Sequence, residues 1–177
     1  SKEEYQKAIE AVCEVTAFSG GKYADAFDEE IEILCSAKRA VKNNAKVIMG
    51  TGSNSTETAV MMSKRAEKEG ADAILSVVPY YNKPSQEGLY QHYKAIAQST
   101  DLPIVLYNVP GRTGANMTAE TALRLAEIEN VIAVKEASSD VGQALEKVRL
   151  CGDKVDFYSG NDDLIVPMMA MGFKGVI

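Results

Sequence analysis

Lys135 is the residue whose type and position point most directly to chemistry, because it ends the apolar run 131–134. An isolated ammonium in an apolar interior is costly or gives up its proton, and a neutral lysine forms Schiff bases with carbonyl substrates. A second apolar run, 103–106, ends in Tyr107, whose phenol can supply proton transfers. The structural alternatives are a buried ion pair for the lysine and a core position for the tyrosine. Glu136 is a poor ion-pair partner for Lys135, since adjacent residues of a strand point to opposite faces.

Polar and aromatic residues follow the other apolar runs too, and the carboxyl ends of parallel strands gather at one rim. Arg112 lies in the Gly/Pro-rich segment 107–114. A guanidinium there suits bidentate capture of a substrate carboxylate, although a solvated loop arginine is an equal alternative. Tyr80 and Tyr81 follow Pro79 and are expected to be exposed aromatic residues at the rim. Packing against the loop or a contact between subunits would also explain them.

Three further features receive structural interpretations. The segment 50–53 resembles a phosphate cradle but lacks the G-K-[ST] ending and the third glycine of a dinucleotide site, so it is interpreted as a tight turn before a helix cap. The acidic segment 161–163 is expected to begin a helix rather than to bind a cation. His92 lies between Gln91 and Tyr93 in the middle of a predicted helix and is expected on or near the surface.

The elements that must position these residues repeat regularly. Strands are predicted for the β-branched apolar runs 46–49, 73–78, 103–107, 131–135, 154–158 and 174–177. Helices are predicted at about 55–69, 86–99, 118–127, 140–149 and 161–171. Their N-caps are expected at 53–56, 84–85 and 118. Gly70 and Gly152 are expected to end helices in the left-handed conformation. Such alternation indicates an α/β protein with a parallel sheet, a (β/α)8 TIM barrel, with a doubly wound open sheet as the alternative.

The first 44 residues depart from this repeat. Helical spacing occurs at 2–14 and 27–43, with a doubtful short strand at 15–18 and a turn at 19–21.

Six clear strands and a doubtful one are fewer than the eight of a closed barrel. The last predicted strand ends at Ile177. We therefore expect a single partial TIM-barrel domain over 1–177, with a divergent helical segment at 1–44 and βα repeats at 45–177. The barrel is expected to be incomplete or rearranged at its N-terminus and truncated after its last strand.

Composition excludes several classes of function. The 177 residues are 46% hydrophobic and 25% charged, with a net charge of -6, which disfavours nucleic acid and anionic membranes as partners. No apolar run reaches membrane-spanning length, and we expect no signal peptide. Cys13, Cys35 and Cys151 lack C-x-x-C spacing, which favours reduced cytosolic thiols over disulfides or a zinc site. His92 is the only histidine, so a histidine-rich metal centre is excluded. We expect no metal, no other cofactor and a cytoplasmic location.

Several motifs together resemble a known family. They are P-Y-Y-N-K-P-S-Q-E-G-L-Y-Q-H-Y at 79–93, L-Y-N-V-P-G-R-T-G at 106–114, V-K-E-A-S at 134–138 and S-G-N-D-D at 159–163. The motifs and their mutual spacing are similar to those of the dihydrodipicolinate synthase (4-hydroxy-tetrahydrodipicolinate synthase) family, pyruvate-dependent class I aldolases grouped with N-acetylneuraminate lyase. The resemblance covers about residues 46–177 and implies a (β/α)8 barrel that forms homodimers or homotetramers and uses no cofactor.

The resemblance also implies roles for individual residues. Lys135 would form the Schiff base with pyruvate, Tyr107 would shuttle protons, and Arg112 would hold the carboxylate of aspartate semialdehyde. Tyr81 would be a catalytic relay tyrosine that reaches into the site of a neighbouring subunit. The main chain near Gly160 and Ile177 would line the pyruvate pocket.

Other positions match the family less closely. Asn54 and Tyr80 correspond to its lysine feedback site, but the glutamate four residues after that asparagine is Thr58 here. The family's G-T-T-G-E turn, which supplies the relay threonine that bridges the two tyrosines, is missing from this sequence. In an ungapped comparison, Phe18 stands where the relay threonine belongs, and Ser19 is the candidate that would bind the pyruvate carboxylate instead.

The activity that the resemblance implies is condensation of pyruvate with L-aspartate 4-semialdehyde to 4-hydroxy-tetrahydrodipicolinate, a lyase step of diaminopimelate and lysine biosynthesis. A pyruvate-dependent aldolase acting on a sugar acid or sialic acid is the nearest alternative, and N-V-P-G-R-T-G argues against it. A different alternative is a catalytically silent partial barrel that pairs with another copy.

Overall fold

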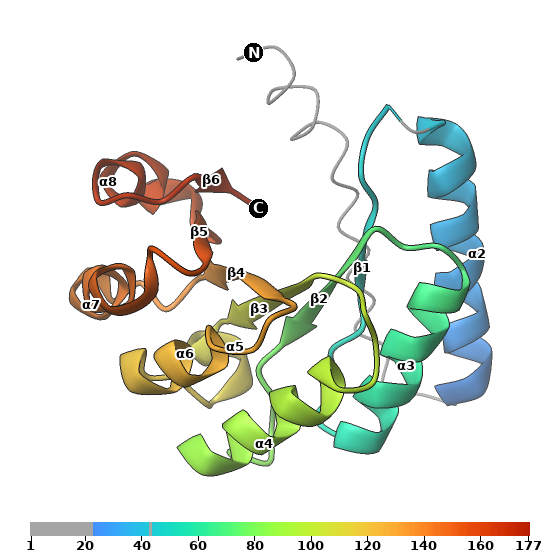
Figure 1. Cartoon of the computed structure of the whole chain (residues 1–177), viewed down its shortest axis with the longest axis horizontal. Helices are drawn as coiled ribbons and strands as arrows, with labels where there is room; N and C mark the ends of the chain where they lie inside the picture. Colours follow the sequence, from blue (N-terminus) through green and yellow to red (C-terminus); the bar gives the residue numbers. More distant parts are fainter. Residues whose placement is uncertain (1–22, 43) are drawn as a thin grey trace.

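The computed structural model describes residues 23–42 and 44–177 (Figure 1). Its sheet has six parallel strands in the sequential order β1 to β6. They are β1 (Ile48–Gly50), β2 (Ala73–Val77), β3 (Ile104–Asn108), β4 (Val131–Glu136), β5 (Asp156–Ser159) and β6 (Gly175–Val176). Strands paired strictly in chain order curl as in a TIM barrel, whereas a doubly wound sheet reverses its order at a switch point. The predicted partial barrel is therefore confirmed over the described residues, and the open-sheet alternative is wrong.

Helices alternate with these strands on one side of the sheet (Figure 1). They are α2 (Tyr23–Val41), α3 (Thr56–Lys68), α4 (Gln86–Ala97), α5 (Pro110–Thr113), α6 (Ala119–Leu125), α7 (Val141–Cys151), the 3-10 turn η1 (Asp162–Leu164) and α8 (Ile165–Ala170). The side chains of Ser55, Ser85, Thr118 and Asp140 accept hydrogen bonds from first-turn N–H groups and so fix where α3, α4, α6 and α7 begin.

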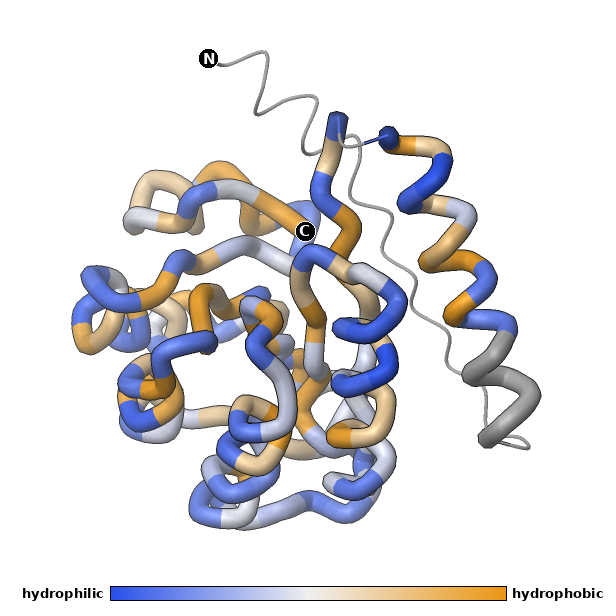
Figure 2. The backbone as a smooth tube through the Cα atoms, turned by 45° about the vertical axis from the view of Figure 1, so that its right-hand side comes forward, coloured by the Kyte–Doolittle hydropathy of each residue, from blue (hydrophilic) through white to orange (hydrophobic). Residues whose placement is uncertain are grey.

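Apolar residues fill both faces of the sheet, since side chains alternate along a strand. The outer face packs against the helices in a large cluster that includes Ile74, Leu106 and Val134. The inner face carries a smaller cluster of Leu75, Val105 and Ala133, flanked by Ile48, Tyr107, Tyr158 and Ile177. The hydropathy of the chain alternates along the helices accordingly (Figure 2).

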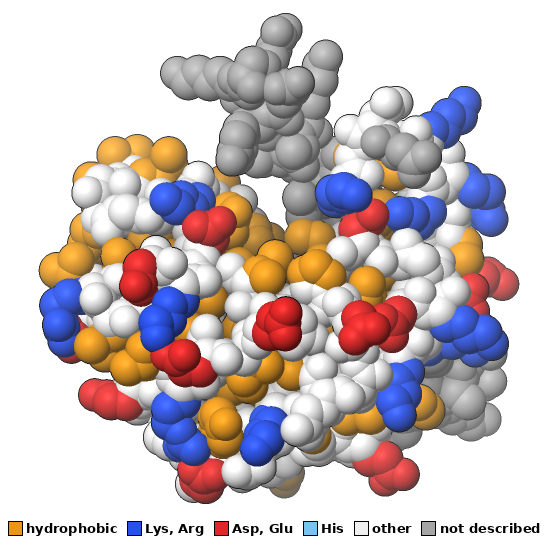
Figure 3. All heavy atoms as spheres, in the orientation of Figure 1, with side chains coloured by type: hydrophobic (Ala, Val, Ile, Leu, Met, Phe, Trp, Pro, Cys, Tyr) orange, Lys and Arg blue, Asp and Glu red, His pale blue; other side chains and the backbone are white. Residues whose placement is uncertain are grey.

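Charged side chains of both signs are interspersed on the face of the molecule drawn in Figure 3. In the described part of the chain, no helix is long and apolar enough to cross a membrane.

Two local predictions were wrong. Gly152 caps α7 with φ -70, because the chain continues in right-handed turns in which Lys154 and Val155 donate to the carbonyl of Cys151; Gly70, with φ 84, does adopt the left-handed conformation. His92 is buried, with 5% of its surface exposed, because it lies on the apolar side of α4 that faces the core.

The N-terminal predictions are tested only in part. The helix expected at 27–43 is α2, which begins at Tyr23 and ends at Val41. The helix expected at 2–14, the doubtful strand at 15–18, Phe18 and Ser19 lie outside the described residues.

Candidate active site

Lys135 lies between two tyrosines on the inner face of the curled sheet. In the parallel register, Tyr107 of β3 pairs with Lys135 of β4, and Lys135 pairs with Tyr158 of β5. The lysine is 4% exposed, and its Nζ lies 4.4 Å from the centroid of the Tyr107 ring. The structure thus brings the predicted nucleophile and the predicted proton shuttle together.

Tyr158 was missed in the sequence. The available signal was its spacing: it lies two residues before Gly160, and in β5 its neighbours Phe157 and Ser159 are fully buried on the outer face. Alternation alone would therefore have turned Tyr158 toward the same face as Lys135.

Gly160 makes room for the Lys135 side chain. A Cβ at Gly160 would lie 3.2 Å from Cε and 3.3 Å from Cγ of Lys135, and 2.9 Å from Cβ of Ala137. Ile177 lies beyond the next strand end, where its N–H donates to the carbonyl of Ser159 at 3.0 Å and its side chain packs against the inner cluster. Gly160 therefore lies against the Lys135 side chain, and Ile177 packs on the same inner face of the sheet.

Arg112 is positioned by the short helix α5 rather than by an open loop. The N–H of Arg112 donates to the carbonyl of Val109 at 2.9 Å, and Gly114 ends the turn with φ 71. The side chain is exposed. A guanidinium in this position, directly after the strand that ends in Tyr107, is available to an acidic ligand approaching the rim.

Tyr80 and Tyr81 follow β2 at the same rim. Tyr81 is 88% exposed and adopts φ 72, a left-handed conformation that side-chain-bearing residues rarely occupy. Its N–H donates to the carbonyl of Thr113 at 3.2 Å, which links this loop to the end of α5. The prediction of an exposed Tyr81 is confirmed, whereas Tyr80 is half-buried. Asn54 lies on the preceding loop, where its carbonyl accepts from Asn82 Nδ2 at 2.9 Å.

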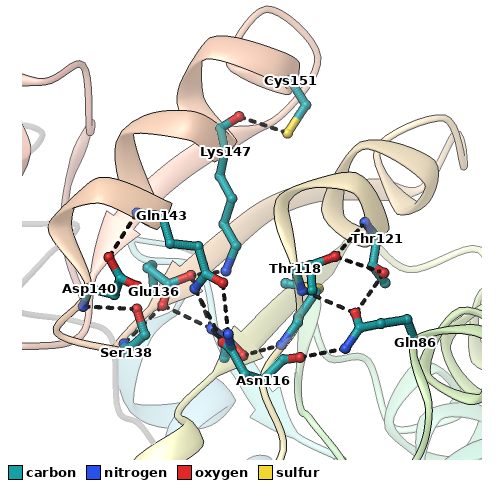
Figure 4. A network of polar contacts seen from close by, with 12 residues as sticks. Gln86, Asn116, Thr118, Thr121, Glu136, Ser138, Asp140, Gln143, Lys147 and Cys151 are labelled. Carbon is teal, nitrogen blue, oxygen red and sulfur yellow. Dashed lines mark hydrogen bonds and ion pairs between the residues drawn. The ribbon is translucent and has the colours of Figure 1, made fainter.

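Behind the inner face, a buried ion pair joins β4 to α7. Lys147 Nζ lies 2.5 Å from Glu136 Oε2, and both side chains are 0% exposed. Glu136 thus points away from Lys135, as alternation predicted. Asn108 Nδ2 donates to the same carboxylate at 3.0 and 3.2 Å. Figure 4 labels Glu136 and Lys147 within this polar network. Neither Asn108 nor Lys147 was singled out in the sequence.

The described residues hold no group of three or more His, Cys, Asp or Glu side chains suited to a metal ion. Within residues 23–42 and 44–177, Cys35 and Cys151 are free thiols, and burial raises the pKa of Cys151 to about 11. The acidic residues at 162–163 begin η1, as expected.

Comparison with known proteins shows the family of this chain. The chain is 52% identical over 151 residues to the 4-hydroxy-tetrahydrodipicolinate synthase of Pelobacter propionicus, which covers 85% of this chain and 52% of that protein. It is 54% identical over 150 residues to the enzyme of the same name from Moorella thermoacetica, covering 85% and 51%. The chain therefore spans about half the length of the curated relatives it matches.

The similar solved structures also belong to dihydrodipicolinate synthases. The crystal structure of dihydrodipicolinate synthase from Bacillus anthracis has a TM-score of 0.84 and 44% identity, with coverage of 89% of this chain and 56% of that one. The enzyme from Thermotoga maritima has a TM-score of 0.84 and 40% identity, with coverage of 100% and 64%. A sequence model of the Dihydrodipicolinate synthetase family matches residues 5–177. Because this match spans nearly the whole chain, the chain belongs to that family.

Proposed function

We propose that this chain carries a lysine Schiff-base site for pyruvate and acts in the condensation of pyruvate with L-aspartate 4-semialdehyde to 4-hydroxy-tetrahydrodipicolinate. The observation that carries the proposal is the burial of Lys135 on the inner face, in register between Tyr107 and Tyr158. The names of the relatives supply the reaction, and the buried amine beside a phenol supplies its first step.

The proposed reaction begins with attack of the Lys135 amine on the ketone carbon of pyruvate. Water leaves as the C–N double bond forms, and the imine then loses a methyl proton to give an enamine. The enamine carbon attacks the aldehyde carbon of the second substrate, whose oxygen takes up a proton. The amine of the joined substrate finally displaces Lys135 and closes the ring. Tyr107 is the group near the lysine proposed to pass protons in these steps.

Arg112 is proposed to select the acidic aldehyde. Its exposed guanidinium at the rim suits a bidentate pair with the substrate carboxylate. The main chain at Gly160 and Ile177 is proposed to line the pyruvate pocket. Ser19 stays a prediction for the pyruvate carboxylate, outside the described residues.

The site is proposed to work between copies of the chain. Tyr81 is an exposed aromatic residue held in an unfavourable backbone conformation, and such positions persist when the surroundings determine them. We expect Tyr81 to enter the site of a neighbouring copy in a homodimer or homotetramer. A related structure is described as the first monomeric dihydrodipicolinate synthase variant, so sedimentation of this chain, and of Tyr81→Ala, is the necessary check. The free thiols support a proposed cytoplasmic location.

Feedback by lysine is proposed to be weak. Asn54 and Tyr80 occupy the positions of the family's lysine site, and a related enzyme from Cyanidioschyzon merolae has been solved with lysine bound. Thr58 here offers no negative charge to an amine ligand. Free lysine is therefore expected to leave imine formation nearly unchanged, which the borohydride assay below would measure when it is run with and without added lysine.

The decisive experiment is trapping with pyruvate and sodium borohydride. Reduction of the pyruvate imine adds ~72 Da to the intact chain, and peptide mapping should place it on Lys135. Lys135→Ala should gain nothing, whereas Lys83→Ala, which removes an exposed lysine of the rim, should gain the full adduct. A wild-type chain without any adduct would refute the proposal and favour the catalytically silent partial barrel.

A further inference from the structure

The buried pair of Glu136 and Lys147 needs an explanation beyond stability. Both side chains are 0% exposed, with 2.5 Å between Nζ and Oε2. Removing two charges from water is costly, and apolar residues of similar volume often stabilise a fold equally well. A buried ion pair is better explained where it fixes the relative position of the segments that carry its two side chains.

The pair lies directly behind the proposed site. Glu136 follows Lys135 on β4, and Asn108 follows Tyr107 on β3, with Tyr107 paired to Lys135 and Asn108 paired to Glu136. Since side chains alternate between faces, Tyr107 and Lys135 lie on the inner face and carry the proposed chemistry. Asn108 and Glu136 lie on the outer face, and Figure 4 shows the polar network around Glu136.

The Glu136 carboxylate is a junction of three segments. It accepts hydrogen bonds from Lys147 of α7, from Asn108 of β3 at 3.0 Å, and from the N–H of Ser138 after β4 at 2.9 Å. Asn108 in turn accepts from the N–H of Met117 at 2.9 Å. The junction therefore also fixes the segment that follows α5, the helix of Arg112.

A second connection reinforces the first. Asn108 Nδ2 donates to Asn116 Oδ1 at 2.9 Å, and Asn116 exchanges two hydrogen bonds, of 2.7 and 3.2 Å, with the side chain of Gln143 on α7. These contacts hold the ends of β3 and β4 against the first turns of α7, and Figure 4 labels Asn116 and Gln143 among them.

We propose that Glu136, held by Lys147, is a positioning residue that sets the amine of Lys135 relative to the phenol of Tyr107. The inference rests on the proposed function, because it concerns the geometry of the same amine. Glu136 itself touches no substrate, since it faces the helices. A small displacement of a nucleophile lowers the rate of attack far more than it lowers binding.

The test is the rate of borohydride trapping at increasing pyruvate concentration in the double variant Glu136→Leu/Lys147→Met. This change removes the charges as a pair and so avoids an orphan ion, while it deletes the bonds to Asn108 and Ser138. The matched control is Glu146→Leu/Arg149→Met, the same change in an exposed ion pair of α7, with side chains 44% and 64% exposed.

In the folded double variant, the maximal trapping rate is expected to fall at least about tenfold, with half-saturating pyruvate within about twofold of wild type. The control should trap as wild type does. A purely structural pair would lower the melting temperature and leave trapping by the folded protein unchanged, and that result overturns the inference while the proposed function stands. Absence of an adduct in the wild-type chain would instead refute the proposed function, and the inference with it.

If the double variant does not fold, Asn116→Ala decides the question. Asn116 is half-buried and uncharged, so its loss removes a connection without leaving an ion. A reduced maximal trapping rate at unchanged half-saturation supports the positioning role, and a wild-type rate overturns it.

Discussion

His92 should make the stability of this protein fall in mild acid. It is the only histidine in the sequence, and its Nδ1 lies 2.9 Å from Thr56 Oγ1. Its Nε2 is buried with no hydrogen-bond partner among the described residues. Protonation would therefore bury an N–H of a charged ring without an acceptor, and this burial lowers the pKa of His92 from 6.5 to about 4.

The size of the effect follows from the two pKa values. Because the folded value is the lower one, the unfolded chain binds more protons between them, and stability is lost as the pH falls from 6.5 toward 4. The stabilisation is fully present above pH 6.5 and amounts to about 3 kcal/mol, at about 1.4 kcal/mol per pH unit. Roughly 2 kcal/mol of it should be lost by pH 5.

The assay compares urea unfolding of wild type and His92→Gln at pH 7, 6 and 5. Carboxylates titrate in both proteins, so their contribution cancels when the unfolding free energies of wild type and His92→Gln are subtracted. The free energy of unfolding of the wild type should fall about 2 kcal/mol more than that of His92→Gln between pH 7 and pH 5. The histidine ring signals in NMR spectra of the folded wild type should not titrate in this range. A constant difference between the two proteins, or a ring that titrates near pH 6.5, would show that the burial argument is wrong.

Two glycine substitutions test the packing of the rim. Gly52→Ala should destabilise the fold by about 1–3 kcal/mol, because the new Cβ would meet the backbone N of Val77 at 2.5 Å. Thermal melting measures this loss, and the control Gly111→Ala, whose new Cβ would have no atom within 4 Å, should melt as wild type does. Gly160→Ala should slow pyruvate trapping at least about tenfold by pushing against the Lys135 side chain, and a wild-type trapping rate would mean that the lysine has room to move aside.

Regular elements were predictable because both periodicities are strong in this chain. The run predicted as a strand at 131–135 is β4, Val131–Glu136, and the helix predicted at 86–99 is α4, Gln86–Ala97. The boundaries of the first strand were less accurate, since it was expected at 46–49 and found at Ile48–Gly50. Its boundary is set by pairing with β2 from Ile48 onward rather than by its own apolar residues.

His92 shows where reading neighbours in sequence fails. Gln91 and Tyr93 flank it, which favoured a surface position. On a helix, however, the relevant neighbours are three or four residues away: Leu89 and Ile96, both fully buried, place His92 on the apolar side of α4. Helical spacing, applied to His92, would have predicted its burial.

The polar network of Asn108, Glu136 and Lys147 behind the candidate site was missed in the sequence for a different reason. A polar residue at the end of a strand, such as Asn108 or Glu136, is expected at the rim of any barrel and carries no signal of its own. Lys147 did carry one, because it lies between Ala144 and Cys151 on the buried side of α7, where a lysine requires an anion. Glu136 was the acid left over once alternation had turned it away from Lys135. A search for the anion that Lys147 requires would therefore have paired it with Glu136, the acid that faces away from Lys135. The same argument applies wherever a buried strand carries adjacent residues of opposite charge.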